Sequence, residues 1–257
     1  MTPTPLPIDV KLMNLTATVM FTACALLLAA ALGWWALRHP LFALGGITVE
    51  GDVAHNNAAT LRANVAPRLS GNFFTVDLVR AREAFEAVPW VRHAVVRRQF
   101  PNRLRVELEE HRALAYWGSD TESRLVNTHG EVFEANPSDV PDDLPRLSGP
   151  EGSSAPVLAM YQALRPLFEP LELGIEELVL SGRGGWTLHL DSGAVVELGR
   201  GSNEEVLARS QRFAATLTQV TSKYGRRPEA LVTADLRHAT GYAVKLRGVA
   251  TTAAPGN

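Results

Sequence analysis

A long apolar run near the N-terminus constrains this chain more than any other feature. Residues 15–37, LTATVMFTACALLLAAALGWWAL, contain no charged side chain over 23 positions. As an α-helix such a run measures about 34 Å, and the hydrocarbon core of a bilayer is about 30 Å thick. Trp34 and Trp35 lie near its end, where aromatic rings favour the headgroup level. The run therefore predicts a helix that crosses a membrane.

Two other interpretations of this run are less favoured. A signal peptide could be cleaved at the small residues 29–31, but Lys11 is the one basic residue before the run, and the run exceeds the usual length of a signal core. A buried helix of a soluble protein would normally carry a polar stripe, which the run lacks. The flanking charges, Lys11 on one side and Arg38 on the other, do not fix which end faces the cytoplasm. No second run of this length follows, so the remaining residues are expected on one side of the membrane.

Composition and motifs argue against several functional classes. The 257 residues carry 25 Lys and Arg against 27 Asp and Glu, and the net charge of -2 gives no global attraction to nucleic acid. The single cysteine, Cys24, lies inside the apolar run, so an intrachain disulfide or a cysteine-based metal cage cannot form. The histidines show no metal-binding spacing, and the chain has no phosphate-binding loop, dinucleotide motif or nucleophile elbow. We expect a protein without catalytic residues, metal or cofactor, and without a nucleic-acid or small-molecule partner.

The residues after the run predict a small domain. Residues 47–50 alternate apolar and polar side chains and are followed by a Gly-Asp turn, which is typical of a short strand. Asn57 is suited to cap a helix that runs to about residue 65. Residues 73–88 place apolar side chains at helical spacing.

The most regular segment is VPWVRHAVVRRQFPNRLRVELEE at 88–110. Its proline ends the preceding helix, FPNR at 100–103 turns the chain, and residues 104–109 alternate apolar and charged side chains. The segment predicts an antiparallel hairpin with one buried face, which completes a β-α-α-β-β domain at 41–110. Its basic side chains are better explained by a solvated strand face than by anionic headgroups or glycan polymers, because nearby glutamates dilute their charge. These side chains are Arg92, Arg97, Arg98, Arg103 and Arg105.

A second region, 111–248, alternates strand and helix patterns. Apolar side chains recur at helical spacing over 157–168 and 206–224, and a hairpin is predicted between these helices. Residues 231–248 contain two strand-like pieces on either side of a turn at 239–241. The fold class expected for the whole chain is a single-pass membrane protein with an α+β region, in which a β-rich domain with packed helices follows the small domain.

Four segments, in this order, resemble the FtsQ/DivIB family of bacterial cell-division proteins, and more closely its branch from Gram-negative bacteria. In that family a cytoplasmic tail precedes one membrane helix, a POTRA domain and a β-rich domain. The resemblance implies a tail at 1–14, a POTRA domain at 41–110, a β domain at 111–248 and a C-terminal tail at 249–257. The matching segments are ITVEG at 47–51, VPWVRHAVVRRQFPNRLRVELEEHRALAYW at 88–117, LGRG at 198–201 and ADLRHATGYAVKL at 234–246.

The resemblance also implies a function. It implies a non-enzymatic divisome scaffold in the bacterial inner membrane, with a cytoplasmic N-terminus and a periplasmic bulk, concentrated at the division septum. In the family the POTRA domain contributes to septal recruitment, and further divisome partners such as FtsK, FtsW, FtsI and FtsN are implied. The last strand of the β domain receives FtsB, which comes paired with FtsL.

Carried over position by position, the resemblance implies a partner-binding region near the C-terminus. The chain departs from the family pattern at His238, where tyrosine is familiar, and at Leu246, where tryptophan is familiar. The implied residues are Arg183, Asp235, Leu236, Arg237, His238, Thr240, Gly241, Tyr242, Val244 and Leu246.

The physics of such binding does not depend on the resemblance. A terminal strand has one neighbour in its sheet, so its other row of N–H and C=O groups can receive a partner strand. Arg237, Lys245 and Arg247 would suit an acidic partner, but the same charges could simply protect an edge from aggregation. Two other functions use the same compartment or domain. One is a POTRA-containing accessory of outer-membrane transport or secretion, and the other is a membrane-tethered cell-wall hydrolase, for which the sequence offers no candidate pair of catalytic residues.

Overall fold

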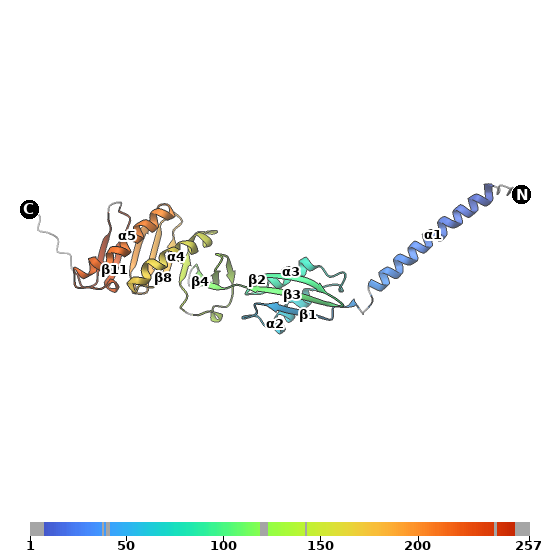
Figure 1. The fold of residues 1–257 in the computed structure, drawn as a ribbon, viewed down its shortest axis with the longest axis horizontal. Helices are drawn as coiled ribbons and strands as arrows, with labels where there is room; N and C mark the ends of the chain where they lie inside the picture. The colour runs from blue at the N-terminus through green and yellow to red at the C-terminus, as the bar shows by residue number, and fades with distance from the viewer. Residues whose placement is uncertain are drawn as a thin grey trace, which may run out of the picture. The chain divides into compact units, whose positions relative to one another are not determined.

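The computed structural model divides the chain into two compact units, Met1–Glu110 and His111–Asn257 (Figure 1). Each unit has its own hydrophobic core. The residues that the structure describes are 8–37, 39, 42–118, 123–141, 143–238 and 241–249.

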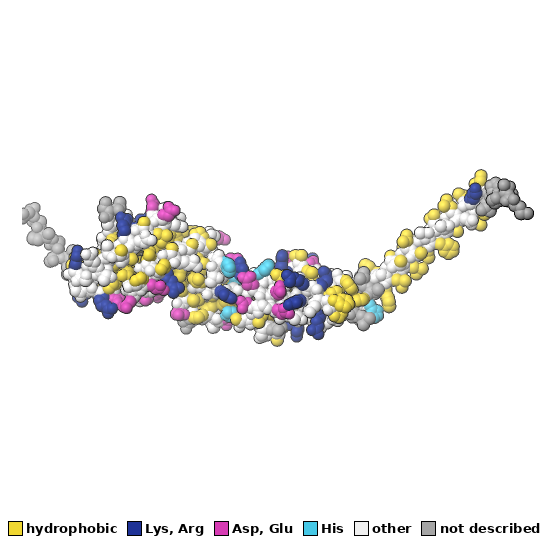
Figure 2. All heavy atoms as spheres, viewed as in Figure 1, with side chains coloured by type: hydrophobic (Ala, Val, Ile, Leu, Met, Phe, Trp, Pro, Cys, Tyr) yellow, Lys and Arg dark blue, Asp and Glu magenta, His cyan; other side chains and the backbone are white. Residues whose placement is uncertain are grey.

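The helix α1 (Ile8–Leu37) contains the predicted apolar run. Its segment Ile8–Trp35 is long and apolar enough to cross a membrane, and its most hydrophobic window is not buried against the protein. Figure 2 shows hydrophobic side chains along its length. Thr22 donates its hydroxyl hydrogen bond to the carbonyl of Thr18 at 2.7 Å, so this polar group needs no water. The helix fits a single-pass membrane span.

This helix begins seven residues before the predicted start at residue 15. Residues 8–14 belong to the predicted tail, but none of them is a proline or glycine that would stop a helix. Asp9 lies in the first turn, where a negative side chain suits the helix dipole. Residues 1–7 lie outside the described residues.

The predicted order β-α-α-β-β is confirmed in the first unit. Its sheet has the order β1-β3-β2, with β1 parallel and β2 antiparallel to β3. Leu61 and Phe85, one from each helix, pack in one core with Val106 of β3. The elements are β1 (Gly46–Gly51), α2 (Ala58–Val65), η2 (Ala66–Arg68), α3 (Leu78–Glu86), β2 (Val91–Gln99) and β3 (Arg103–Glu110).

Local hydrogen bonds explain where the two helices of this unit begin. Asn57 caps α2 as predicted, because its side chain accepts from the N–H of Thr60 at 2.7 Å. The helix predicted at 73–88 starts only at Leu78. The side chain of Asn72 accepts from the N–H of Thr75 and folds the preceding residues into a turn, so Asp77 becomes the cap.

In the described part of the second unit, nine strands form one sheet in the order β12-β11-β10-β9-β8-β7-β4-β5-β6. Helices α4 and α5 contact each other and pack on this sheet (Figure 1). Val249, in the predicted C-terminal tail, packs against the core of this unit, and residues 250–257 lie outside the described residues. The strands are β4 (Ala113–Trp117), β5 (Arg124–Asn127), β6 (Val132–Glu134), β7 (Arg146–Ser148), β8 (Ile175–Leu180), β9 (Trp186–Leu190), β10 (Val195–Gly199), β11 (Leu231–Asp235) and β12 (Ala243–Leu246), and the helices are η3 (Pro137–Asp139), α4 (Ser154–Phe168), η4 (Glu169–Leu171), α5 (Asn203–Ser222) and η5 (Pro228–Ala230).

The helix α5 matters for the site because it lies beside the last strands. It is started by a capping box, in which the side chains of Ser202 and Glu205 each accept from the other residue's backbone N–H. Phe213 and Leu217 are fully buried on the sheet-facing side. The ring of Phe213 lies 6.3 Å from that of Phe168 in α4, which joins the two helices. The opposite face of α5 is left available at the surface.

Candidate functional site

The strand β12 forms one edge of the nine-stranded sheet. Among the described strands it pairs only with β11, with Asp235 opposite Ala243 and Ala234 opposite Val244. A strand in this position leaves one row of N–H and C=O groups without a ladder partner. The predicted edge position of this strand is confirmed.

The hydrogen bonds of β11 indicate which groups of β12 face outward. The N–H of Leu236 donates to the carbonyl of Glu197 on β10 at 2.9 Å. The backbone N–H and C=O groups of even-numbered residues in this stretch therefore point to β10, and those of odd-numbered residues point to β12. Ala234 therefore faces β10, and Val244, which lies opposite it, directs its own N–H and C=O away from β11. No described strand lies on that side.

A cavity of about 320 Å³ lies next to this edge, and we call it the α5 cavity. Leu236 forms an apolar part of its wall, whereas two arginines and a histidine give it a basic lining. Within the described residues, neither arginine has a carboxylate at ion-pair distance. The cavity is lined by Arg209, Arg212, Ala215 and Thr216 of α5, and by Leu236, His238, Gly241 and Tyr242 from the segment that joins β11 to β12.

Tyr242 fixes the start of β12 against α5. Its hydroxyl lies 2.6 Å from the hydroxyl of Thr216, and its ring meets that of Phe213 edge to face at 5.0 Å. Edge-to-face aromatic contacts of this kind add stability beyond the area that they bury. The edge strand therefore starts from a fixed point on the helix.

A second contact orders the end of β11. The guanidinium of Arg237 donates to both carboxylate oxygens of Asp235, at 2.9 and 2.6 Å, and the backbone N–H of Arg237 donates to one of them at 3.0 Å. These hydrogen bonds hold the pKa of Asp235 well below its usual range. The positive charge of Arg237 is therefore largely neutralised by the carboxylate of Asp235.

Comparison with known proteins places the chain in a family. The model described as "POTRA domain, FtsQ-type" matches residues 42–111, and that described as "Cell division protein FtsQ/DivIB, C-terminal" matches residues 115–237. The cell division protein FtsQ of Burkholderia pseudomallei strain K96243 is 45% identical over 94% of each chain. That of Bordetella pertussis strain Tohama I is 40% identical, over 93% of this chain and 92% of its own length. The chain belongs to the FtsQ family of cell division proteins.

The FtsQ-type match confirms the POTRA domain and favours cell division over the transport interpretation, which shared that domain. The match to the C-terminal family model ends at residue 237, before β12 begins. The edge strand and three residues of the α5 cavity wall, His238, Gly241 and Tyr242, are therefore defined by the fold of this chain rather than by that match.

Within this FtsQ-family fold, one of the residues predicted to bind a partner has a buried side chain. Leu246 is 5% exposed and belongs to the core of the second unit, so its side chain does not face a partner. The alternation of β12 explains this, because Val244 and Leu246 point to the helix-covered face whereas Ala243 and Lys245 are exposed. The part of Leu246 in partner binding stays a prediction, which its buried side chain does not favour, and Val244 is half-buried.

Arg183 lies away from the other predicted residues. It is exposed in the turn between β8 and β9, and it does not line the α5 cavity. Trp186, at the start of β9, pairs with Gly199 at the end of β10, which puts this turn at the same end of the sheet as the segment joining β11 to β12. Three strand spacings of about 4.8 Å, or about 14 Å, separate β9 from β12. Arg183 could contact only a partner that extends across this end of the sheet.

The remaining predicted residues lie at the α5 cavity or outside the described residues. Leu236, His238, Gly241 and Tyr242 meet at the α5 cavity. A side chain added at Gly241 would meet no atom within 4 Å, and its φ is not positive, so this glycine is not required by the backbone. Thr240 lies outside the described residues.

The residues that α5 contributes to the cavity were not predicted from the sequence. Arg209, Arg212 and Thr216 recur at positions i, i+3 and i+7 and so share one face of the helix. That spacing was visible in the sequence, but polar side chains at helical spacing are typical of any solvated face. Only the position of α5 beside the joining segment distinguishes them.

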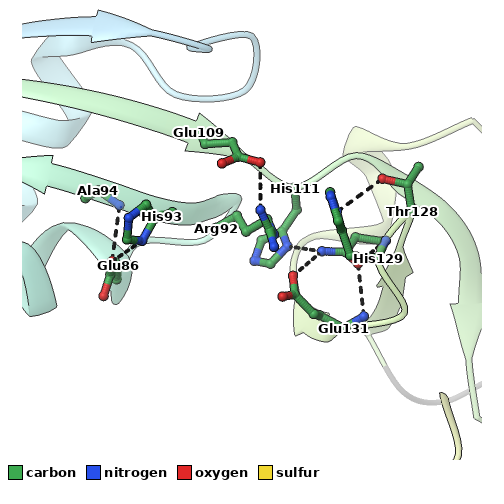
Figure 3. Close-up of polar contacts among 10 residues, drawn as sticks. Glu86, Arg92, His93, Ala94, Glu109, His111, Thr128, His129 and Glu131 are labelled. Carbon is green, nitrogen blue, oxygen red and sulfur yellow. Dashed lines mark hydrogen bonds and ion pairs between the residues drawn. The ribbon is translucent and has the colours of Figure 1, made fainter. Parts of the chain in front are cut away.

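The basic cluster predicted on the hairpin of the first unit is mostly paired with carboxylates. Arg92 donates to Glu109 at 2.7 Å, as Figure 3 shows, and Arg97 donates to Glu107 at 3.3 Å. Arg105 pairs with the carboxylate of Glu50 on β1. For these three arginines the solvated strand face is the better interpretation. Within the described residues, no group of three or more His, Cys, Asp or Glu side chains could hold a metal ion.

Proposed function

We propose that this chain is a non-enzymatic scaffold of the bacterial division machinery that captures the paired proteins FtsB and FtsL at the β12 edge. The observation that carries the proposal is the outward row of β12 backbone groups beside the basic α5 cavity. Membership of the FtsQ family supports the role in division. The family resemblance supplies the identity of the partners.

In this proposal a segment of FtsB adds to β12 as a further strand. Main-chain hydrogen bonds to Val244 give affinity, and alternate side chains of the added strand give selectivity. Because Leu246 is buried, an apolar side chain of the partner enters the α5 cavity instead of packing on position 246. Arg212 and His238 favour carboxylates near that side chain.

The rest of the chain serves this capture. The helix α1 crosses the inner membrane once, with residues 1–14 in the cytoplasm and the domains at 41–110 and 111–248 in the periplasm. The POTRA domain contributes to recruitment at the septum and to contacts with divisome proteins such as FtsK, FtsW, FtsI and FtsN. The match to the FtsQ-type POTRA model supports this assignment, and depletion of the protein is expected to leave cells as undivided filaments.

A proline at position 244 tests the capture directly. In Val244→Pro the outward N–H is lost while the ladder to β11 is kept, and proline is tolerated on an edge strand. We expect pull-down of the FtsB–FtsL pair by the full-length protein to fall by about tenfold or more, because the variant loses a main-chain hydrogen bond to the added strand. Unfolding of the free protein should change by less than about 1 kcal/mol.

The matched control is Val244→Ala, which shortens the same side chain and retains the N–H. Capture by this variant should stay close to that of the original protein. Equal capture by the proline and alanine variants would refute strand addition at β12, whatever the role of the protein in division.

A further inference from the structure

Four phenylalanines gather at one end of the first unit, and we call them the phenylalanine tip: Phe42, Phe73, Phe74 and Phe100. The ring of Phe74 lies 5.0 Å from that of Phe42 and 5.2 Å from that of Phe73, and Phe100 lies 6.4 Å from Phe73. Phe100 is 79% exposed and Phe74 is 44% exposed. Large apolar side chains grouped at the surface of a folded domain indicate a contact with something outside it.

The tip is built from three separate segments that are bonded to one another. The N–H of Phe73 donates to the carbonyl of Phe42 at 2.9 Å, and the N–H of Gly45 donates to the carbonyl of Asn102 at 2.8 Å. Arg98 donates to the carbonyl of Phe73 at 2.7 Å. The exposed rings therefore stand on a fixed support, at the end of the sheet where β1 starts and β2 turns into β3.

The sequence segments that form the tip carry positive charge and no acid, and the first acid after Phe74 is Asp77. The segments 38–49, 53–76 and 87–106 contain no aspartate or glutamate. Among the described residues, Arg62, Arg68 and Arg103 have no carboxylate at ion-pair distance, whereas Arg92, Arg97 and Arg105 each have one. Arg62 and Arg103 also line a cavity of about 610 Å³ beside β1. Figure 2 shows hydrophobic and basic side chains together at this end of the unit.

The chain ties the tip to the end of α1. Four residues, 38–41, separate Leu37 at the end of α1 from Phe42. A fully extended chain over this stretch reaches about 18 Å. Trp34 and Trp35 place the end of α1 at the headgroup level if the helix spans a bilayer. Phe42 then cannot leave the neighbourhood of the membrane surface, whatever the orientation of the domain.

We propose that the phenylalanine tip binds the surface of the membrane that α1 crosses. Phe74 and Phe100 enter the headgroup region, and Arg68 and Arg103 contact the phosphates of anionic lipids, which is the combination that holds peripheral segments on membranes. This inference rests on the proposed membrane span of α1. The contact fixes the POTRA domain close to the bilayer.

The test uses the full-length protein in nanodiscs of phosphatidylcholine with about a quarter phosphatidylglycerol, an anionic lipid. An environment-sensitive fluorophore is attached to Phe100→Cys in a Cys24→Ser background. The control label is at Val53→Cys, because Val53 is 44% exposed and follows the opposite end of β1. A third sample carries the label on the native Cys24 of α1, which reports insertion of the helix itself.

We expect the label at position 100 to be blue-shifted and to be quenched several-fold more strongly than that at 53 by lipids with a nitroxide near the headgroup. Adding Arg68→Glu and Arg103→Glu should lower this quenching. Quenching at 100 no stronger than at 53 would overturn the proposal. A blue shift without lipid quenching would overturn it in favour of a second copy of the chain or another protein. With lipids that carry the nitroxide deep in the acyl chain, an unquenched label at Cys24 would refute the membrane span and the tip together, whereas a quenched Cys24 with a position 100 that headgroup nitroxides do not quench refutes the tip alone.

Discussion

The two units of this chain each present an edge strand, and the two edges are covered differently. On β2 the N–H of Ala94 donates to the carboxylate of Glu86 at 3.2 Å, and the same carboxylate pairs with His93 at 3.0 Å (Figure 3). On β12 the outward groups of Val244 face away from every described strand. The side chain of Glu86 on α3 thus accepts a hydrogen bond from the edge of β2, whereas the edge of β12 is left open beside the α5 cavity. Because an open edge is a hazard for aggregation, the contrast supports the proposed capture of a partner at β12.

Replacing Glu86, which covers the edge of β2, should have the largest effect on the stability of the fold. In Glu86→Ala the N–H of Ala94 loses its acceptor and His93 loses its contact with the carboxylate, so we expect the free energy of unfolding to fall by about 1–2 kcal/mol. Amide hydrogen exchange at Ala94 should accelerate at the same time. Glu83→Ala on the same helix is the control, since Glu83 is exposed. Unchanged protection of Ala94 would show that Glu86 does not close this edge.

The basic lining beside β12 should contribute to capture. Arg212→Gln lowers the charge of α5 by one unit at the cavity, and we expect binding of an acidic partner to weaken by about tenfold, or about 1.4 kcal/mol. The loss should shrink in high salt. Gln211→Glu lowers the charge of the same helix by the same amount at an exposed position that does not line the cavity. An equal loss in both variants would mean that overall charge, and not the cavity, attracts the partner.

A smaller effect is expected from filling the space beside the edge. Gly241→Val adds a side chain that the free protein can accept, because no atom lies within 4 Å of the new Cβ. The folded protein should therefore keep its stability, while capture falls by a few-fold as the side chain enters the space of the partner. Gly182→Val in the turn between β8 and β9, where the space is equally open, is the control. Co-purification of both variants at normal levels would show that this space is not used.

The smallest effect is expected on the stability of the folded chain at low pH. The pKa of Asp235 is lowered in the folded chain, chiefly by hydrogen bonds from Arg237, so the contribution of this carboxylate to stability is present above its unfolded pKa of about 4 and is lost as the pH falls below it. Since Asp235 is accessible to solvent, this contribution is small. Asp235→Asn should flatten the acid side of the stability profile slightly, as followed by thermal unfolding from pH 7 downward. A profile that coincides with that of the original protein would show that the pair does not hold the end of β11.

Patterns of short range in the sequence predicted most of the fold. The apolar run, the cap at Asn57 and the alternation at 104–109 each depend on residues that are neighbours along the chain, so α1, α2 and β3 could be identified. The start of α3 was misplaced because Asn72 bonds the turn before it, a contact that helical spacing does not reveal.

The site depended on contacts across the sheet. The sequence by itself determined that a last strand with cationic neighbours lies near the C-terminus, because alternation and turn residues are local signals. Only the tertiary structure decided that Leu246 is buried, that Arg183 lies three strands away and that α5 supplies half of the cavity. The order of strands and the packing of a helix against them bring together residues far apart in the chain, and no local pattern encodes which of those residues will meet.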